Sequence, residues 1–193
     1  MEEKKGEPVL ELADADAWAA WLDEHHDSVR GVWLKIAKKG SGATTVSYEH
    51  AVEEALCQGW IDGQSSSYDE SFWLQRYTPR GPRSKWSQIN CTRVERLTAE
   101  GRMRPAGQAA VDAAKADGRW DAAYAPPSTA TVPPDLQAAL DQNPAAAEFF
   151  ATLTGSNRYA VLYRVADAKR PETRARRIEK YVEMLARGEK IHP

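Results

Sequence analysis

The sequence predicts an α+β fold, in which a small antiparallel sheet of about three strands packs with helices and an all-helical C-terminal half follows. Three observations predict it. Segments with the period-2 alternation of strands lie between helical patterns in the first half of the chain. From Ser87 onward, all patterns but one are clearly helical. Hydrophobic residues make up 42% and charged residues 28% of the 193 residues, a balance typical of a chain with a packed core.

The first half opens with a helix and a strand. Asp14 is a suitable N-cap for a helix that runs to about His26, and apolar residues recur along it at helical spacing. Residues 30–37, with the sequence RGVWLKIA, alternate between apolar side chains on one side and Trp33 and Lys35 on the other. This alternation predicts a half-buried strand.

A second helix and two further strands complete the predicted sheet. Ser47 is the expected N-cap of a helix with one apolar face, which Gly59 ends. Residues 60–62 and 71–77 are the two strands, and we expect Ser65–Ser67 and Asp69 to connect them. Helices on one face of such a sheet bury its apolar side.

The second half contains helical patterns separated by Gly and Pro. Predicted helices span residues 88–100, 105–116 and 135–140, and others begin at Pro144 after the cap Asn143 and at Pro171. Residues 158–166 fit both a helix and a strand. The Ser156–Asn157 cap and the helical neighbours favour a helix.

A linker rich in Pro, Ser and Thr, residues 125–134 (APPSTATVPP), is the one obvious joint in the chain. It divides the chain into an α+β core region, 1–124, and a helical region, 135–193. Four prolines predict an extended linker with few backbone hydrogen bonds. Because helices on both sides of it have apolar faces that need cover, we expect the helical region to pack on the core as a single structural unit.

Charge is strongly segregated although the net charge is only −2. Residues 1–73 carry a net charge of −9, residues 74–104 +6, residues 105–154 −4 and residues 155–193 +5. One interpretation is that these blocks pair across the fold or are solvated. The other is that the first basic block forms part of an anion-binding surface.

A Pro-stiffened loop in that basic block is the candidate site. Residues 78–84 present Arg80 and Arg83 directly before the start of a helix, where unpaired N–H groups favour anions. We expect tryptophans to wall the site, basic residues to hold a phosphate or carboxylate, and Asp62 and Asn90 to orient it. Arg80→Ala should then abolish binding and leave most of the stability intact. The predicted ligand-binding residues are Trp60, Asp62, Arg76, Arg80, Ser84, Lys85, Trp86 and Asn90. In the alternative interpretation, Arg76 and Arg80 pair with Asp62, Asp69 or Glu70 and the tryptophans belong to the core.

Enzymatic motifs are missing from the sequence. It contains no phosphate-binding glycine motif, no nucleophile elbow and no histidines at metal-ligand spacing. His50 and Cys57 lie about 10 Å apart on a helix, too far for direct proton transfer. We therefore predict no catalytic residue, no metal and no cofactor. An enzyme that uses Asp62, Arg80 and Trp86 remains the alternative.

A basic C-terminal helix suggests a third function, nucleic-acid binding. Arg170, Arg174 and Arg177 share one helical face, which could follow phosphates. Interleaved glutamates, however, predict a salt-bridged surface, so nucleic acid is not the expected partner. The longest apolar runs are too short for a membrane span. A charged start, MEEKK, lacks the apolar region of a secretory signal, which favours a cytoplasmic location.

Four motifs resemble one known family when taken in order. ALCQGWIDGQ, RYTPRGPRSKWSQIN, GRMRPAG and AKRPETRARRI resemble the YdeI/OmpD-associated, or bacteriocin-protection, family between residues 18 and 185. Gln58 and His50 depart from the pattern, which has an aromatic and an acid there. The resemblance implies a cytoplasmic bacterial protein of bacteriocin or stress tolerance, without an assigned reaction. It carries over only the motif positions Trp60, Asp62, Arg80, Ser84, Trp86 and Asn90. Together with the candidate site, it predicts a tolerance protein that binds an anionic small molecule or an acidic peptide segment.

Overall fold

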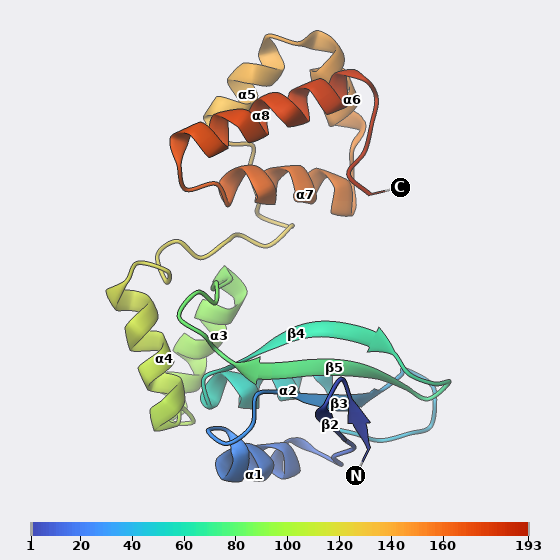
Figure 1. Ribbon diagram of the computed structural model, residues 1–193, viewed down its shortest axis with the longest axis vertical. Coiled ribbons are helices and arrows are strands. Elements are labelled where there is room, and N and C mark those ends of the chain that lie inside the picture. Colours follow the sequence, from blue (N-terminus) through green and yellow to red (C-terminus); the bar gives the residue numbers. More distant parts are fainter. Residues whose placement is uncertain (1, 193) are drawn as a thin grey trace. The chain divides into compact units, whose positions relative to one another are not determined.

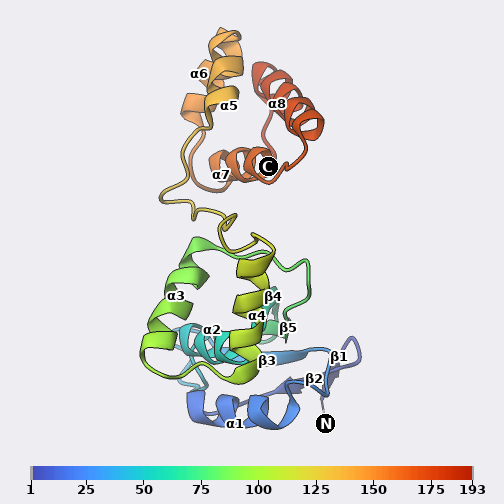
Figure 2. The ribbon, with the colours of Figure 1, turned by 90° about the vertical axis from the view of Figure 1, so that its left-hand side faces the viewer.

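The computed structural model describes residues 2–192, which divide into two compact units (Figures 1 and 2). The α/β unit comprises the chain up to Trp86 together with Asn90–Ala123. The helical unit comprises Ser87–Ile89 and the chain from Tyr124 onward. Each unit has its own apolar core. The expectation that the helical region packs on the α/β region as a single structural unit stays a prediction.

The α+β class is confirmed, but the sheet is larger than predicted and is mixed. Its five strands are β1 (Glu3–Lys4), β2 (Glu7–Leu10), β3 (Val32–Ala37), β4 (Trp60–Ser67) and β5 (Phe72–Pro79), in the order β1-β2-β3-β5-β4. The β2–β3 pair is parallel and the other pairs are antiparallel. The prediction of about three antiparallel strands missed β1 and β2 because they have only 2 and 4 residues, too few for a visible alternation.

Strand β4 also extends beyond the predicted residues 60–62. Asp62 pairs with Tyr77, and after a register shift Ser65 pairs with Gln75, so the serine run belongs to the strand and not to the connection. The turn comes later, where the Asp69 side chain accepts hydrogen bonds from the N–H groups of Ser71 and Phe72. Strand β4 lies at the sheet edge, contains a bulge and is mostly exposed beyond Asp62. Such a strand does not need apolar residues at alternate positions, so the apolar alternation in the sequence stops before the strand does.

Helices of the α/β unit agree with the predicted positions. They are α1 (Ala15–His25), α2 (Tyr48–Cys57), α3 (Gln88–Ala99, whose first two residues group with the helical unit) and α4 (Pro105–Ala116). The Asp14 side chain accepts from the N–H of Ala17, and that of Ser47 from the N–H of His50, so both predicted caps form. Helix α4 approaches the end of α2 so closely that a Cβ atom at Gly107 would lie 2.1 Å from the Cys57 carbonyl oxygen.

The two faces of the sheet have different environments. Val32, Leu34 and Ile36 of β3 belong to the main core with the apolar residues of the helices. Trp33, on the opposite face, is buried with Val9 and Leu74, and Lys4 lies 4.9 Å from its ring centroid. Residues that oppose each other directly in an antiparallel pair share a face, so register decides which side chains meet.

The helical unit contains α5 (Pro134–Asp141), α6 (Pro144–Thr152), α7 (Gly155–Ala166) and α8 (Pro171–Ala186). Residues 158–166 are helical, as predicted, but the predicted Ser156–Asn157 cap is wrong: the helix begins at Gly155 after Thr154, so both residues lie in its first turn. The linker is less extended than predicted. Pro126 accepts hydrogen bonds from Thr129 and Ala130, and Ala130 and Val132 pack on the helical core. Among residues 2–192, no helix has the length and apolar character to cross a membrane.

Candidate functional site

The structure does not bring the eight predicted site residues together. Trp60 is buried in the core, where its ring packs edge-on against Trp18 and its Nε1–H donates to the His26 carbonyl at 3.2 Å. Arg76 lies on the opposite face of the sheet from Tyr77, because neighbouring residues of a strand alternate. Its Nε donates to Glu7 Oε2 at 2.7 Å. The structure therefore does not bring Trp60 and Arg76 together, and their roles in ligand binding stay predictions.

The loop after β5 contains a turn closed by a side chain, and its Arg80 side chain is turned inward. Ser84 Oγ accepts from the Gly81 N–H at 3.0 Å and closes a tight turn. The Arg80 guanidinium lies 3.6 Å from the centroid of the buried Trp86 ring, and its Nη1 donates to the Lys85 carbonyl at 3.1 Å. Arg80 Nε and Nη2 are buried. This arrangement makes Arg80 part of the packing, while the Lys85 side chain is exposed.

Asp62 does not lie opposite the residues of this loop in the sheet. Pro79 pairs with Trp60 and Tyr77 pairs with Asp62. Arg80 therefore lies three strand positions from Asp62, about 10 Å along the sheet at ~3.3 Å per residue. The backbones of Asp62 and Arg80 are thus separated along the sheet, and a site formed jointly by Asp62, Arg80 and Trp86 stays a prediction.

Asp62 instead lies beside two tyrosines. Tyr48, at the start of α2, donates its hydroxyl to Asp62 Oδ2 at 2.8 Å. The Tyr48 ring lies 5.8 Å from that of Trp73 and is 36% exposed. Tyr77 is the register partner of Asp62 and lies on the same face of the sheet. The Tyr77 side chain is fully buried, with Trp18 at 5.5 Å between ring centroids.

The Tyr77 hydroxyl is an exception among buried polar groups. It is buried and forms no hydrogen bond with any group in residues 2–192. Most buried polar groups are paired, and an unpaired one costs about 1–3 kcal/mol. Burial, the Asp62 carboxylate and Tyr48 raise the pKa of Tyr77 above its usual value, and Arg93 acts in the opposite direction. The phenol therefore stays protonated and is a hydrogen-bond donor.

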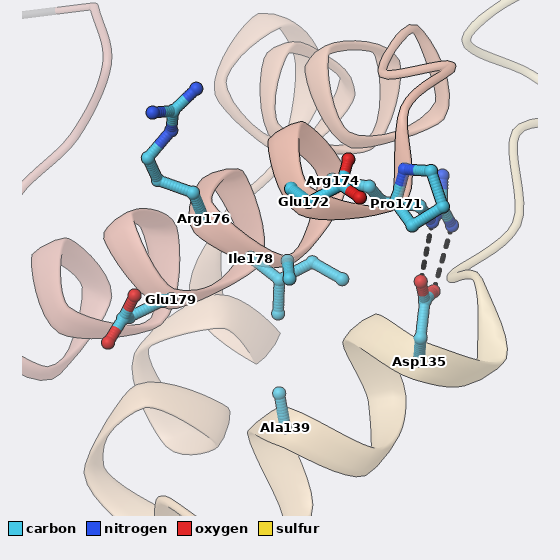
Figure 3. A pocket seen from close by; sticks show the side chains of 9 residues that line it. Asp135, Ala139, Pro171, Glu172, Arg174, Arg176, Ile178 and Glu179 are labelled. Atoms are coloured by element: carbon cyan, nitrogen blue, oxygen red, sulfur yellow. Dashed lines mark hydrogen bonds and ion pairs between the residues drawn. The ribbon is translucent and has the colours of Figure 1, made fainter.

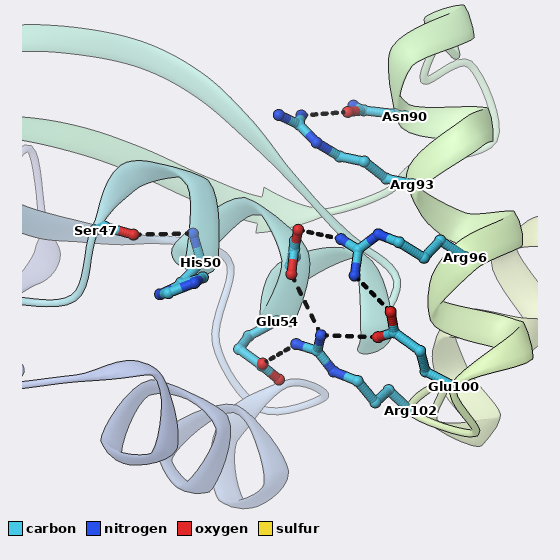
Figure 4. Close-up of polar contacts among 9 residues, drawn as sticks. Ser47, His50, Glu54, Asn90, Arg93, Arg96, Glu100 and Arg102 are labelled. Atoms are coloured by element: carbon cyan, nitrogen blue, oxygen red, sulfur yellow. Dashed lines mark hydrogen bonds and ion pairs between the residues drawn. The ribbon is translucent and has the colours of Figure 1, made fainter.

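Arg93 differs from the other arginines of α3 and the turn that follows. Arg96 pairs with Glu53 and Glu100, and Arg102 with Glu54 at 2.5 Å, so acidic and basic blocks do pair across α2 and α3 (Figure 4). Arg93 forms no ion pair with any residue between 2 and 192. Its Nη1 donates to the neutral Asn90 Oδ1 at 3.1 Å, and Figure 4 shows the guanidinium reaching away from the ion-pair network.

We refer to Tyr48, Asp62, Tyr77, Asn90 and Arg93 as the Tyr77 cluster. It combines one carboxylate, one guanidinium and a buried phenol donor, drawn from α2, the sheet and α3. The sequence pointed to Asp62 and Asn90 but missed Tyr48, Tyr77 and Arg93. One signal was available: Arg93 lies three residues after Asn90 and so shares its helical face.

The basic helix α8 has partners for two of its three aligned arginines. Arg174 Nη2 donates to Asp135 Oδ1 at 2.8 Å, and Arg177 Nη1 donates to the Arg164 carbonyl at 2.5 Å. The predicted partners on the same helix were wrong, because other elements of the helical unit supply them. A shallow, open hollow of about 840 Å³ lies beside the Arg174–Asp135 pair, with Ile178 and Ala139 facing each other across it (Figure 3). The expectation that nucleic acid is not a partner stays a prediction.

The potential metal ligands of residues 2–192 form no cluster, and both thiols are buried. Among residues 2–192, no group of three or more His, Cys, Asp or Glu side chains could hold a metal ion. Cys57 and Cys91 are both buried free thiols. Burial raises the pKa of each thiol to about 11, so both are protonated near neutral pH.

Two family models match different parts of the chain. Residues 10–110 match the model described as a domain of unknown function (DUF8412). Residues 129–188 match the model described as bacteriocin-protection, YdeI or OmpD-associated. Of the four motifs that resemble the latter family, only AKRPETRARRI lies inside its match, and the other three lie within 10–110. No curated protein and no solved structure matched. The Tyr77 cluster lies entirely within residues 10–110.

Proposed function

The chain belongs to the family described as a domain of unknown function, DUF8412, and we propose that this part of it binds a small anionic molecule through a carboxylate at the Tyr77 cluster. The observation that carries the proposal is the Tyr77 hydroxyl, which is buried without a hydrogen-bond partner in residues 2–192 and lies beside Asp62. A ligand oxygen that accepts from this hydroxyl would recover the free energy of the unpaired group.

Arg93 supplies the positive charge that would attract the carboxylate of such a ligand. Its guanidinium is half-buried and, within residues 2–192, bonds a neutral amide and no carboxylate, whereas Arg96 and Arg102 are already neutralised by glutamates. A carboxylate can accept two parallel hydrogen bonds from a guanidinium, and these charge-assisted bonds are about twice as strong as neutral ones. The Tyr77 hydroxyl is buried, so a neighbouring side chain must rotate to admit the ligand, and Tyr48, which is exposed and bonded to Asp62, is the candidate.

Binding is favoured over catalysis at this cluster. The protonated phenol of Tyr77 is a donor and not a base, and Asp62 already accepts the Tyr48 hydroxyl. A small molecule is favoured over an acidic peptide because the proposed site centres on a single buried hydroxyl. The match of residues 129–188 to the bacteriocin-protection family supports a role in bacteriocin or stress tolerance, for which we propose a cytoplasmic location.

Titration with small anions tests the proposal. Amide NMR spectra of the full chain are recorded with acetate, succinate, citrate, inorganic phosphate and an acidic peptide. We expect saturable shifts at residues 48, 62, 77 and 93 with a carboxylate. Arg93→Met should weaken binding at least tenfold, whereas Arg96→Met, one turn along the same helix, should not. Equal effects of the two substitutions, or shifts with the peptide alone, would contradict the proposal.

A further inference from the structure

Strand β4 forms one edge of the sheet, and within residues 2–192 its single neighbouring strand is β5 (Figure 1). In an antiparallel ladder, the backbone groups of successive residues point alternately to the two sides of the strand. The Lys38 N–H donates to the Ser71 carbonyl at 2.8 Å, so the odd-numbered residues of β5 bond β3 and the even-numbered ones bond β4. The bond from the Arg80 N–H to the Gly59 carbonyl, at 2.9 Å, agrees with this alternation.

Ser65 and Ser67 therefore present their backbone groups to the open side of β4. Ser66, between them, is the register partner of the even-numbered Leu74 and bonds β5. Within residues 2–192, no hydrogen bond joins the N–H of Ser65 or Ser67 to another element. Both residues are exposed, and residues 60–67 contain no Lys or Pro, the residues that commonly protect a sheet edge from pairing.

The helix-side face of β4 carries an acid beside two aromatic rings. Asp62 accepts the Tyr48 hydroxyl on Oδ2 at 2.8 Å and forms no ion pair within residues 2–192. The Tyr48 ring lies 5.8 Å from that of Trp73, and both side chains are partly exposed. Trp73 is the register partner of Ser67 and so shares this face with it. A carboxylate next to exposed aromatic rings attracts a cation.

We propose that an extended segment of another protein, carrying lysine or arginine, adds to the open side of β4 as a sixth strand. Backbone bonds to Ser65 and Ser67 would supply affinity, and side chains at alternate positions would supply specificity. A cationic side chain on the helix-side face would lie against Asp62 and the two rings. On the opposite face, the Lys4 ammonium donates to Ser66 Oγ at 2.7 Å, so further cations would be repelled there.

Charge also argues against a second copy of this chain as the occupant. Antiparallel pairing of two β4 strands about Ser66 would bring Asp62 of each copy toward the acidic turn at residues 69–70 of the other. Like charges that face each other across paired strands are destabilising. The proposal concerns the sheet edge and does not depend on anion binding at the Tyr77 cluster.

Three matched peptides test the strand addition on the unmodified full chain. The first alternates threonine and lysine, the second has glutamate in place of each lysine, and the third is the lysine peptide with its backbone nitrogens methylated. By fluorescence anisotropy, we expect the first to bind saturably and at least tenfold more tightly than the other two. Its binding should also protect the amide protons of Ser65 and Ser67 from hydrogen exchange. Failure of the lysine peptide to bind, or equal binding of any two peptides that include it, would overturn the proposal.

Variants then locate the contact. Ser65→Pro removes an outward N–H and no ladder bond, so it should weaken binding of the lysine peptide at least fivefold. Ala15→Pro should leave binding unchanged, because the extended Asp14 precedes it and proline is favoured at the first position of a helix. Asp62→Asn should reduce the advantage of lysine over glutamate, whereas Glu24→Gln, an exposed acid on α1, should not. Equal effects within either pair would contradict the proposal. A dimer in sedimentation experiments that Ser65→Pro dissociates would instead assign the edge to a second copy.

Discussion

Asp62 and Tyr77 are register partners on adjacent antiparallel strands, and the carboxylate of the first lies on the same face of the sheet as the buried phenol of the second. The Tyr77 hydroxyl has no hydrogen-bond partner in residues 2–192, so removing it should not harm the fold. We expect Tyr77→Phe to raise the free energy of unfolding by up to about 1–3 kcal/mol. Ligand binding should be lost at the same time.

Tyr48→Phe provides the matched comparison in urea denaturation. It also deletes a phenol oxygen, but this hydroxyl donates to Asp62 at 2.8 Å. We expect it to lower the free energy of unfolding by less than about 1 kcal/mol, because Tyr48 is exposed. If Tyr77→Phe destabilised the chain more than Tyr48→Phe, the Tyr77 hydroxyl would be a structural group.

Arg80 should matter for stability, contrary to the expectation from the sequence. Its guanidinium stacks on Trp86 and donates to the Lys85 carbonyl. Loss of both contacts should lower the free energy of unfolding by about 1–3 kcal/mol in Arg80→Ala. Arg83→Ala, in the same loop but exposed, should change it by less than about 0.5 kcal/mol. Equal melting temperatures for the two variants would show that the stacked geometry contributes nothing.

The Glu7–Arg76 ion pair makes the free energy of unfolding depend on pH. The hydrogen bond from Arg76 is the main reason that the pKa of Glu7 is lowered from its usual 4.5. A depressed pKa in the folded state gives stabilisation that is present above the unfolded value and is lost as pH falls through the folded value. We expect the difference in unfolding free energy between the natural chain and Glu7→Gln to shrink between about pH 6 and about pH 3. A constant difference across this range would count against the pair.

The two thiols should be unreactive in the folded chain. Both have a pKa near 11 because they are buried, and the thiolate is the reactive form. At neutral pH, we expect an aromatic disulfide reagent to label neither Cys57 nor Cys91 until denaturant unfolds the chain. Rapid labelling of either thiol without denaturant would show that its surroundings open readily.

Cooperativity tests the predicted single structural unit. If the helical region packs on the α/β region, calorimetry of the full chain should give one transition whose calorimetric and van't Hoff enthalpies agree. Because each unit has its own core, independent units would instead give two transitions. Two transitions would therefore contradict the prediction.

The sequence by itself determined most of the helices and two of the longer strands. Caps such as Asp14, Ser47 and Asn143 act on N–H groups within three residues, and apolar periodicity is equally local. These signals can be read without knowing what packs against them. The short strands β1 and β2 were missed because their pairing partners, not their own pattern, make them strands.

Only the tertiary structure decided which polar residues meet. Arg76 and Tyr77 are neighbours in sequence, yet strand alternation places them on opposite faces, and Glu7 from β2 neutralises the arginine. The Tyr77 cluster draws on α2, the sheet and α3, so its members converge only through long-range register and helix packing. A local pattern indicates which residues carry charge. Whether a charge is neutralised depends on residues that are distant in the sequence. In the described chain, neither Arg93 nor Asp62 has an ion-pair partner.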